Sequence, residues 1–346
     1  MMFMPKLPSP LENQASDFAS ARVSSTKPSG TEPVVGLALG GGSARGWAHI
    51  GILKKLDEAG IRPTVVVGTS IGAVVGGSWA AGKLNELEDF ARSITKRSML
   101  GMMDLRLVGS GLLSGDRLRR QLEERFQGSL IEELPIKFAA VSTEIRTGHE
   151  IWLTRGQITD AMRASYALPG IFVPVQIGGR WLMDGALSNP VPVSVARALG
   201  AEMIIAVNLH TDVLGRSGVV HEHGGMEPGL ATLPSQQQDA AQQGLMASVY
   251  GAASRVRRQF GSGANDKESA PGILSVMLDA FNITQDRIAR SRLAGDPPDV
   301  TVGPKIGGIG LSEFHRADEA IAAGEAAVLK VIDDILDIHK ALSVRK

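Results

Sequence analysis

Apolar runs alternate with amphipathic stretches along the chain, and each transition falls at glycine or polar residues. The run 34–39 is continuously apolar, as parallel strands buried on both faces are. The next stretch, 47–56, has apolar residues at helical spacing and ends before Gly60, a suitable helix stop. A second apolar run at 64–67 leads into the small-residue stretch 73–81, which suits a closely packed helix. The pattern predicts two consecutive strand–helix units.

The same periodicities place the remaining elements. Helices are predicted over 84–92, 116–126, 157–167, 189–200 and 273–293. Strands are predicted over 136–142, 150–154, 171–175, 203–209 and 299–302, with a hairpin turn at 178–180 before an apolar segment at 181–183. One closing amphipathic helix begins at 312–314, and its core stripe consists of Phe314, Ala317, Ile321, Val328, Val331, Ile335, Ile338 and Leu342. The stretch 98–113 is Met-rich and irregular, which fits core packing, a cover over an apolar pocket or lipid contact.

Two segments differ in composition from the rest of the chain. Residues 1–33 are rich in serine and proline, which predicts a disordered leader. Residues 211–270 have few long apolar runs, which predicts a flexible insertion. Within this insertion, 245–260 combines apolar residues with three arginines and fits either a basic helix on an anionic membrane or a solvated helix. A single folded domain is expected over 34–210 and 271–346.

The composition excludes several classes of protein. The chain has 346 residues with 36 Lys+Arg and 36 Asp+Glu, so its net charge of zero gives no general attraction to nucleic acid. Without cysteine, disulfides, thiolate metal sites and a cysteine nucleophile are impossible, which fits a reducing compartment. No apolar run approaches the length of a membrane span, and residues 1–33 lack the apolar core of a secretory signal. We expect a cytoplasmic protein, and any contact with the membrane should be peripheral and at its inner face.

A nucleophilic serine is indicated where the second apolar run ends. The segment Gly68-Thr69-Ser70-Ile71-Gly72 lies between a predicted strand and a predicted helix, which is the context of a G-x-S-x-G nucleophile elbow. The turn is so tight that its flanking positions accept little beyond hydrogen, which explains both glycines. Ser70 then stands at a helix N-terminus, where free N–H groups and the helix dipole favour negative charge. The pentapeptide alone fits an ordinary strand–turn–helix connection equally well.

The first strand ends in a glycine-rich loop, residues 40–46, that admits three interpretations. A phosphate-binding P-loop is disfavoured because Trp47-Ala48 stands where Lys-Ser/Thr is required, and the dinucleotide motif G-x-G-x-x-G fails from Gly40 and from Gly41. The third is an oxyanion hole, in which successive backbone N–H groups hold a developing negative oxygen. A turn needed only for packing is the alternative. A second such turn carrying Ser70 strengthens the catalytic interpretation, because acyl transfer needs both parts.

An acidic residue and several histidines complete the candidate chemistry. Asp184 lies between the apolar segment after the hairpin and Gly185, a place suited to a carboxylate that must be aimed. An aspartate before glycine is also a common turn residue, and taken alone that explanation is favoured. His221 and His223 lack a spaced third ligand and are assigned to a loop, and His49 is expected to be packed or on the surface.

The order of these motifs resembles the patatin-like phospholipase family. The glycine-rich loop follows the first strand, Gly-x-Ser-x-Gly follows the second, Asp-Gly-Ala comes later, and 164–174 is similar to a fourth block of that family. The string 39–51 is most similar to bacterial members and to the neuropathy target esterase branch. The resemblance covers roughly 34–210 and is compatible with 299–342. It implies an α/β protein with a three-layer α/β/α fold and a mostly parallel central sheet.

The resemblance also implies a lipid acyl hydrolase with a Ser-Asp dyad. Ser70 is expected to be the nucleophile and Asp184 its base, so that an ester is attacked, an acyl-enzyme forms and water releases it. The substrate is expected to be a phospholipid, a lysophospholipid or a related acyl ester. No calcium-loop pattern occurs in the sequence, and dyad chemistry needs no metal or other cofactor.

The glycine-rich loop is expected to stabilise the oxyanion. The resemblance assigns this role to the backbone N–H groups of Gly41, Gly42 and Ser43, with Arg45 supporting the loop. Ser43 departs from the family, which usually has a third glycine there. A backbone N–H survives this change, but Ser43 is strained if the loop requires a positive φ at this residue.

Two other functions stay open. One is a Ser-Asp-His esterase of the α/β-hydrolase type, with His210, His221 or His223 as the base; of these, only His210 ends an apparent strand. The other is a catalytically weak family member that binds lipid or a protein partner without turnover. The presence of both Ser70 and Asp184 argues against the second, and the departure at residue 43 slightly favours it.

Overall fold

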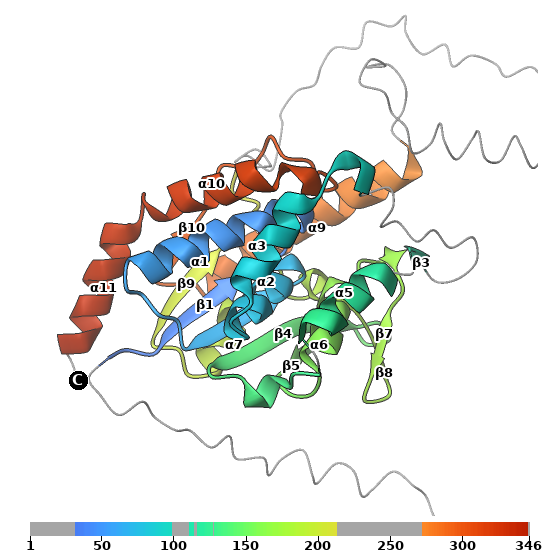
Figure 1. Cartoon of the computed structure of the whole chain (residues 1–346). Coiled ribbons are helices and arrows are strands. Elements are labelled where there is room, and N and C mark those ends of the chain that lie inside the picture. Colours follow the sequence, from blue (N-terminus) through green and yellow to red (C-terminus); the bar gives the residue numbers. More distant parts are fainter. Residues whose placement is uncertain (1–31, 99–110, 114–115, 127, 213–271, 345–346) are drawn as a thin grey trace, which may run out of the picture.

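The computed structural model describes residues 32–98, 111–113, 116–126, 128–212 and 272–344 (Figure 1). Apart from residues 32–33 and 211–212, the predicted leader and the predicted insertion lie outside these residues. The predicted helix at 245–260 and most of the Met-rich stretch do so as well. The division into leader, domain and insertion therefore stays a prediction. Of the helices in the described ranges, none is both long and apolar enough to cross a membrane.

A mostly parallel sheet forms the centre of the described part. Its strand order is β10-β9-β1-β2-β4-β8-β7, and β5 also pairs with β4. The parallel strands are β1 (Val35–Leu39), β2 (Val65–Thr69), β4 (Lys137–Glu144), β9 (Met203–Val207) and β10 (Val300–Val302). The antiparallel strands are β5 (Glu150–Leu153), β7 (Val175–Ile177) and β8 (Arg180–Asp184). A separate parallel pair consists of β3 (Gly111–Leu113) and β6 (Gly170–Phe172).

Helices lie on both faces of the sheet (Figure 1), which confirms the three-layer α/β/α architecture. One buried cluster includes residues of α1 (Ala48–Glu58), α2 (Ile71–Ala80), α3 (Leu84–Ser93), α5 (Asp116–Phe126), α6 (Ile158–Tyr166), α10 (Ala317–Val328) and α11 (Ile332–Val344). The other includes residues of α7 (Val193–Ala198) and α9 (Ile273–Gly295). Short 3-10 helices occupy Ser43–Trp47, Ile131–Glu133, Gly185–Leu187 and Phe314–Arg316.

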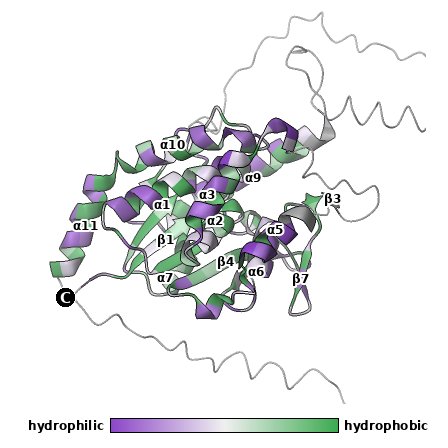
Figure 2. Cartoon of the chain, in the orientation of Figure 1, coloured by the Kyte–Doolittle hydropathy of each residue, from purple (hydrophilic) through white to green (hydrophobic). Residues whose placement is uncertain are grey.

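The central strand β1 shows how the sequence forms these layers. Leu37 and Leu39 belong to the first cluster and Ala38 to the second, because successive side chains of a strand point to opposite faces. Gly36 also lacks room for a larger residue, since a Cβ atom there would lie 2.4 Å from Cβ of Ala201. Figure 2 shows hydrophilic and hydrophobic residues alternating along α10 and α11, as in helices that bury one side only.

Most predicted strands and helices match the structure, with three corrections. The extended segment predicted over 171–175 is divided between β6, which ends at Phe172 and pairs with β3, and β7, which begins at Val175 and pairs with β8. The closing helix is not continuous: α10 ends at Val328 and α11 begins at Ile332. Between them the N–H groups of Lys330 and Val331 bond to carbonyls three residues back, and this tighter turn ends α10. The predicted stripe persists across the break, with four members buried and four half-buried. The helix predicted over 189–200 is shortened to α7, because prolines 190 and 192 lack the N–H group that a helix interior needs.

Candidate active site

Ser70 lies in a strained turn between β2 and α2. Its backbone has φ 56° and ψ −124°, a conformation that L-residues rarely adopt. The two flanking positions are glycines because the turn brings neighbouring backbone atoms too close for a side chain. A Cβ atom on Gly68 would lie 2.4 Å from the backbone of Ala73, and one on Gly72 would lie 2.2 Å from the carbonyl oxygen of Leu39. The structure thus has the tight strand–turn–helix connection that the sequence predicted around Ser70.

Asp184 ends β8 and faces Ser70 directly. The Ser70 hydroxyl donates a 2.7 Å hydrogen bond to Oδ2 of Asp184, while Oδ1 accepts the N–H of Ala186 at 2.9 Å. The second bond is the turn contact expected of an aspartate before glycine, so the geometry is compatible with both interpretations given to Asp184. Its side chain is buried, and burial raises the pKa of the carboxyl to about 7, against the opposing effects of the Ala186 and Ser70 hydrogen bonds.

The glycine-rich loop has fewer free backbone N–H donors than the sequence predicted. The N–H of Gly41 donates to the carbonyl of Pro190 at 3.0 Å, so this predicted oxyanion donor is occupied. The N–H groups of Gly42 and Ser43 have no acceptor among the described residues, and both residues line the pocket that contains Ser70. The sequence could not show the bond to Pro190, because it joins segments that are 149 positions apart.

Ser43 has φ 53°, so the loop does require the left-handed conformation that makes a non-glycine residue costly. The side chain is anchored, since its Oγ donates a 2.7 Å hydrogen bond to the carbonyl of Leu311. The N–H of Ala44 donates to the same carbonyl at 3.1 Å. These two bonds fix the strained residue to the segment before α10.

Arg45 lies beneath the loop and is not among the residues that line the pocket. Its Nε donates a 2.7 Å hydrogen bond to the carbonyl of Ile309, and Nη1 donates to Oδ1 of Asn282 in α9 at 3.4 Å. Burial lowers the pKa of the guanidinium, and the carboxylate of Asp279 acts in the opposite direction. The geometry fits the predicted supporting position, because Arg45 ties the loop to two later segments of the chain.

Two residues near the site had no assigned role from the sequence. Oγ of Ser165 in α6 accepts the N–H of Ser70 at 2.9 Å and donates to the carbonyl of Val141 at 2.6 Å. His49 in α1 is fully buried with Nε2 2.8 Å from the carbonyl of Gly40. Burial lowers the pKa of His49 to about 4, so the ring is neutral and Nε2–H donates. Ser165 falls in the 164–174 block noted above, which was the one available signal.

His210 makes no hydrogen bond to Ser70 or Asp184. Its ring is fully buried in the turn three residues after the end of β9, where burial and the charge of Arg45 lower its pKa to about 4 although Asp286 lies nearby. It is not among the residues that line the pocket, whereas Ser70 bonds Asp184 with no group between them. This geometry disfavours a Ser-Asp-His triad through His210. His221 and His223 lie outside the described residues.

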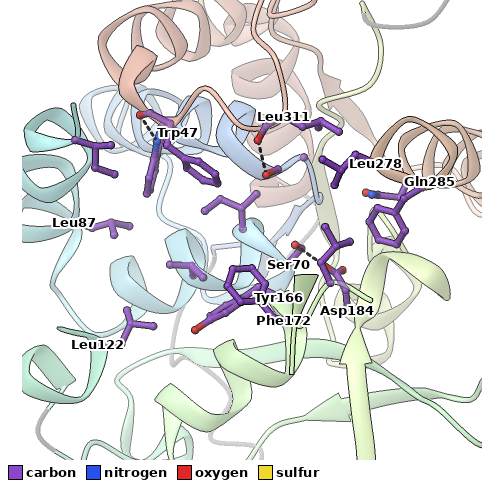
Figure 3. Close-up of a pocket in the computed structure, with 18 of the residues that line it drawn as sticks. Trp47, Ser70, Leu87, Leu122, Tyr166, Phe172, Asp184, Leu278, Gln285 and Leu311 are labelled. Carbon is purple, nitrogen blue, oxygen red and sulfur yellow. Dashed lines mark hydrogen bonds between the residues drawn. The ribbon is translucent and has the colours of Figure 1, made fainter. Parts of the chain in front are cut away.

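An apolar pocket of about 230 Å³ opens from Ser70 and Asp184. Figure 3 shows Leu87 and Leu122 on the side of this pocket away from Gln285, with Ser70 and Asp184 between them and α9. Most of the lining is aliphatic or aromatic, including Trp47, Val74, Leu87, Phe90, Leu122 and Phe172. Such a lining suits a hydrocarbon chain attached to an ester held at Ser70. In the described ranges, no group of three or more His, Asp or Glu residues is positioned to hold a metal ion.

Comparison with known proteins agrees with the resemblance. Residues 37–197 match the sequence profile of the patatin-like phospholipases. An uncharacterized NTE family protein of Mycobacterium tuberculosis is 32% identical over 332 residues, which cover 88% of this chain and 92% of that protein. Patatin-like phospholipase domain-containing protein 6 of Mus musculus is 33% identical over 186 residues, which cover 52% of this chain and 14% of that protein.

One solved structure is also similar. VipD from Legionella pneumophila aligns with a TM-score of 0.44 and 13% identity, over 88% of this chain and 67% of that chain. The match to the mycobacterial relative extends over nearly the whole length of both proteins. The chain therefore belongs to the patatin-like phospholipase family, within its NTE branch.

Proposed function

We propose that this protein hydrolyses carboxylic esters of lipids through a dyad of Ser70 and Asp184. Membership of the patatin-like phospholipase family supports lipid acyl hydrolase activity in general. The observation that carries the specific proposal is the 2.7 Å bond from the Ser70 hydroxyl to a buried carboxylate at the end of an apolar pocket. A phospholipid, a lysophospholipid or a related acyl ester is the proposed substrate, and contact with the membrane surface is proposed to be peripheral.

The proposed reaction is acyl transfer in two steps. Oγ of Ser70 attacks the ester carbonyl while Asp184 takes its proton, and the alcohol leaves with that proton. Water then attacks the acyl-enzyme and gives a proton to Asp184. Asp184 passes this proton to Oγ of Ser70 as the ester bond breaks, so the carboxylic acid is released and both residues return to their starting state. A pKa of about 7 makes Asp184 a stronger base than an ordinary aspartate while it remains substantially ionised near neutrality.

The negative oxygen that forms in each step needs hydrogen-bond donors. The unoccupied N–H groups of Gly42 and Ser43 are the proposed donors, together with the N-terminal dipole of α2, which begins at Ile71. Arg45, Ser165 and the contacts beneath the loop then act by holding these groups in place. No step requires a metal ion or a cofactor.

Hydrolysis of p-nitrophenyl esters by the purified protein tests this proposal. Ser70→Ala and Asp184→Asn are each expected to remove hydrolysis, and a fluorophosphonate probe should label the wild-type protein but not Ser70→Ala. Release of fatty acid from phospholipid and lysophospholipid vesicles then identifies the lipid class. Hydrolysis that survives Asp184→Asn but not His210→Ala would contradict the dyad. Lipid binding without hydrolysis, unchanged in Ser70→Ala, would favour the binding function.

A further inference from the structure

Gln285 is a buried polar residue among the apolar residues of the pocket. It lies in α9, is 4% exposed and lines the same pocket as Ser70 and Asp184. The neighbouring pocket residues on α9 are Leu278 and Phe281. Oε1 of Gln285 has no hydrogen-bond partner among the described residues, and Figure 3 shows the carboxamide nitrogen directed from α9 into the pocket. A buried carboxamide oxygen without a partner is uncommon, so this side chain requires an explanation.

The carboxamide lies close to the position where an ester would react. A Cβ atom built on Gly41 would lie 3.1 Å from Oε1 of Gln285 and 3.6 Å from Cβ of Ser70. The two side chains therefore approach to within about 7 Å across the glycine-rich loop, measured between Gln285 Oε1 and Ser70 Cβ.

We propose that the carboxamide N–H of Gln285 donates a hydrogen bond to the oxygen that becomes negative during acyl transfer. This inference rests on the proposed Ser70 chemistry and adds a catalytic side chain to it. An ester and its tetrahedral intermediate present only acceptor oxygens at the reacting centre, so the useful half of the carboxamide is its N–H₂ group. Because Gly41 is occupied by Pro190, the loop supplies the N–H groups of Gly42 and Ser43, and Gln285 adds a third donor.

The fold holds Gln285 in a defined position. One turn earlier on α9, Asn282 accepts a hydrogen bond from Arg45, which supports the same loop. One turn later, Ala289 is buried in the cluster on the α9 face of the sheet. The helix is therefore fixed on both sides of Gln285, and its carboxamide is pre-organised relative to the loop, as transition-state stabilisation requires.

Steady-state kinetics of three variants test this role. Gln285→Leu is expected to lower kcat by about 100-fold and to leave KM within about twofold, because removal of one oxyanion donor acts on the transition state. Gln176→Leu, at an exposed glutamine of β7, should keep wild-type kinetics. Thermal unfolding of each variant checks that the fold is intact.

Gln285→Glu separates a catalytic role from a structural one through its pH dependence. An ionised carboxylate repels the oxyanion, whereas a protonated carboxyl donates an O–H to it. The ratio of variant to wild-type kcat should therefore rise as the pH falls, while a merely structural defect gives a constant ratio. Wild-type kcat in a folded Gln285→Leu protein, or a constant ratio for Gln285→Glu, would overturn the inference.

The same experiment distinguishes this inference from the proposed function. If Ser70→Ala is inactive but Gln285→Leu retains full kcat, the dyad stands and the role of Gln285 is wrong. If hydrolysis survives Ser70→Ala, or the wild-type protein does not hydrolyse esters, the proposed function fails and the role of Gln285 fails with it.

Discussion

Replacing Asp184 with asparagine is expected to abolish activity and at the same time to stabilise the folded protein above neutral pH. Asparagine has the same shape as aspartate. Its Oδ1 can still accept the N–H of Ala186, and its Nδ2 can donate to the hydroxyl of Ser70, so neither contact of the native carboxyl is lost. It carries no charge into the interior and cannot take the serine proton. We expect kcat to fall by about 10²- to 10⁴-fold, the usual contribution of a general base.

The gain in stability follows from the pKa of the buried carboxyl. Burial raises this pKa from 3.8 to about 7, so the folded protein holds the proton more tightly than the unfolded chain does. Wild-type stability therefore contains a contribution that is complete below about pH 4 and is lost as the pH rises through about 7. The difference between these two pKa values corresponds to about 4 kcal/mol in the free energy of unfolding. The Asp184→Asn variant lacks this pH dependence. Its free energy of unfolding should therefore exceed that of the wild type by less than about 2 kcal/mol at pH 5 and by about 4 kcal/mol at pH 8.

Urea unfolding monitored by tryptophan fluorescence measures this advantage between pH 5 and 9. Asp89→Asn is a matched control, because Asp89 is an exposed carboxyl of α3, and its substitution should give a small difference that does not grow with pH. A constant difference between Asp184→Asn and wild type across this range would refute the argument that burial of the ionised carboxylate costs stability. A variant less stable than wild type at pH 8 would refute it as well.

Three further substitutions probe the geometry around Ser70. Gly72→Ala places a Cβ atom 2.2 Å from a backbone oxygen and should cost more than about 3 kcal/mol in urea unfolding, whereas Gly295→Ala, with open space around it, should be neutral or stabilising. Ser165→Ala leaves the N–H of Ser70 without its acceptor, so a loss of about 1–3 kcal/mol and a lower kcat are expected; unchanged values would show that the elbow does not depend on this bond. Leu87 lines the pocket, and Leu87→Trp should fill part of it. In a series of p-nitrophenyl esters, the variant should prefer a shorter acyl chain, as judged by the highest kcat/KM, and hydrolyse the acetyl ester as the wild type does.

The elements that could be predicted from sequence are those whose causes are local. The continuous apolar run of β1 and the glycines on either side of Ser70 reflect requirements of the backbone at those positions. Asp184 could be proposed as the partner of Ser70 only because three motifs occur in the order typical of the family. An aspartate before glycine is common by itself and would not indicate this role. Its direct bond to Ser70 joins residues 114 positions apart, and no local pattern determines such a contact.

The elements that could not be predicted depend on tertiary packing. The N–H of Gly41 looked free, but Pro190 comes next to it when the strands assemble. Gln285 is one polar residue in a helical stretch, and the sequence does not reveal that it lines the pocket or that its carboxamide oxygen lacks a partner there. The break between α10 and α11 was hidden for a related reason: the apolar stripe continues through it, so periodicity predicted one helix.

Strain connects the two halves of the proposed site. Among the described residues, the non-glycine positions with positive φ are Ser43 and Ser70, and both line the same pocket. Each such conformation costs about 1–3 kcal/mol and persists only where the surroundings hold it. Ser70 is held by Ser165, and Ser43 is held by the carbonyl of Leu311, 268 positions away. Leu311 lies beyond the matched region 37–197, yet its carbonyl holds the loop next to Ser70. We infer that the elements after residue 271 belong to the same domain as the proposed site.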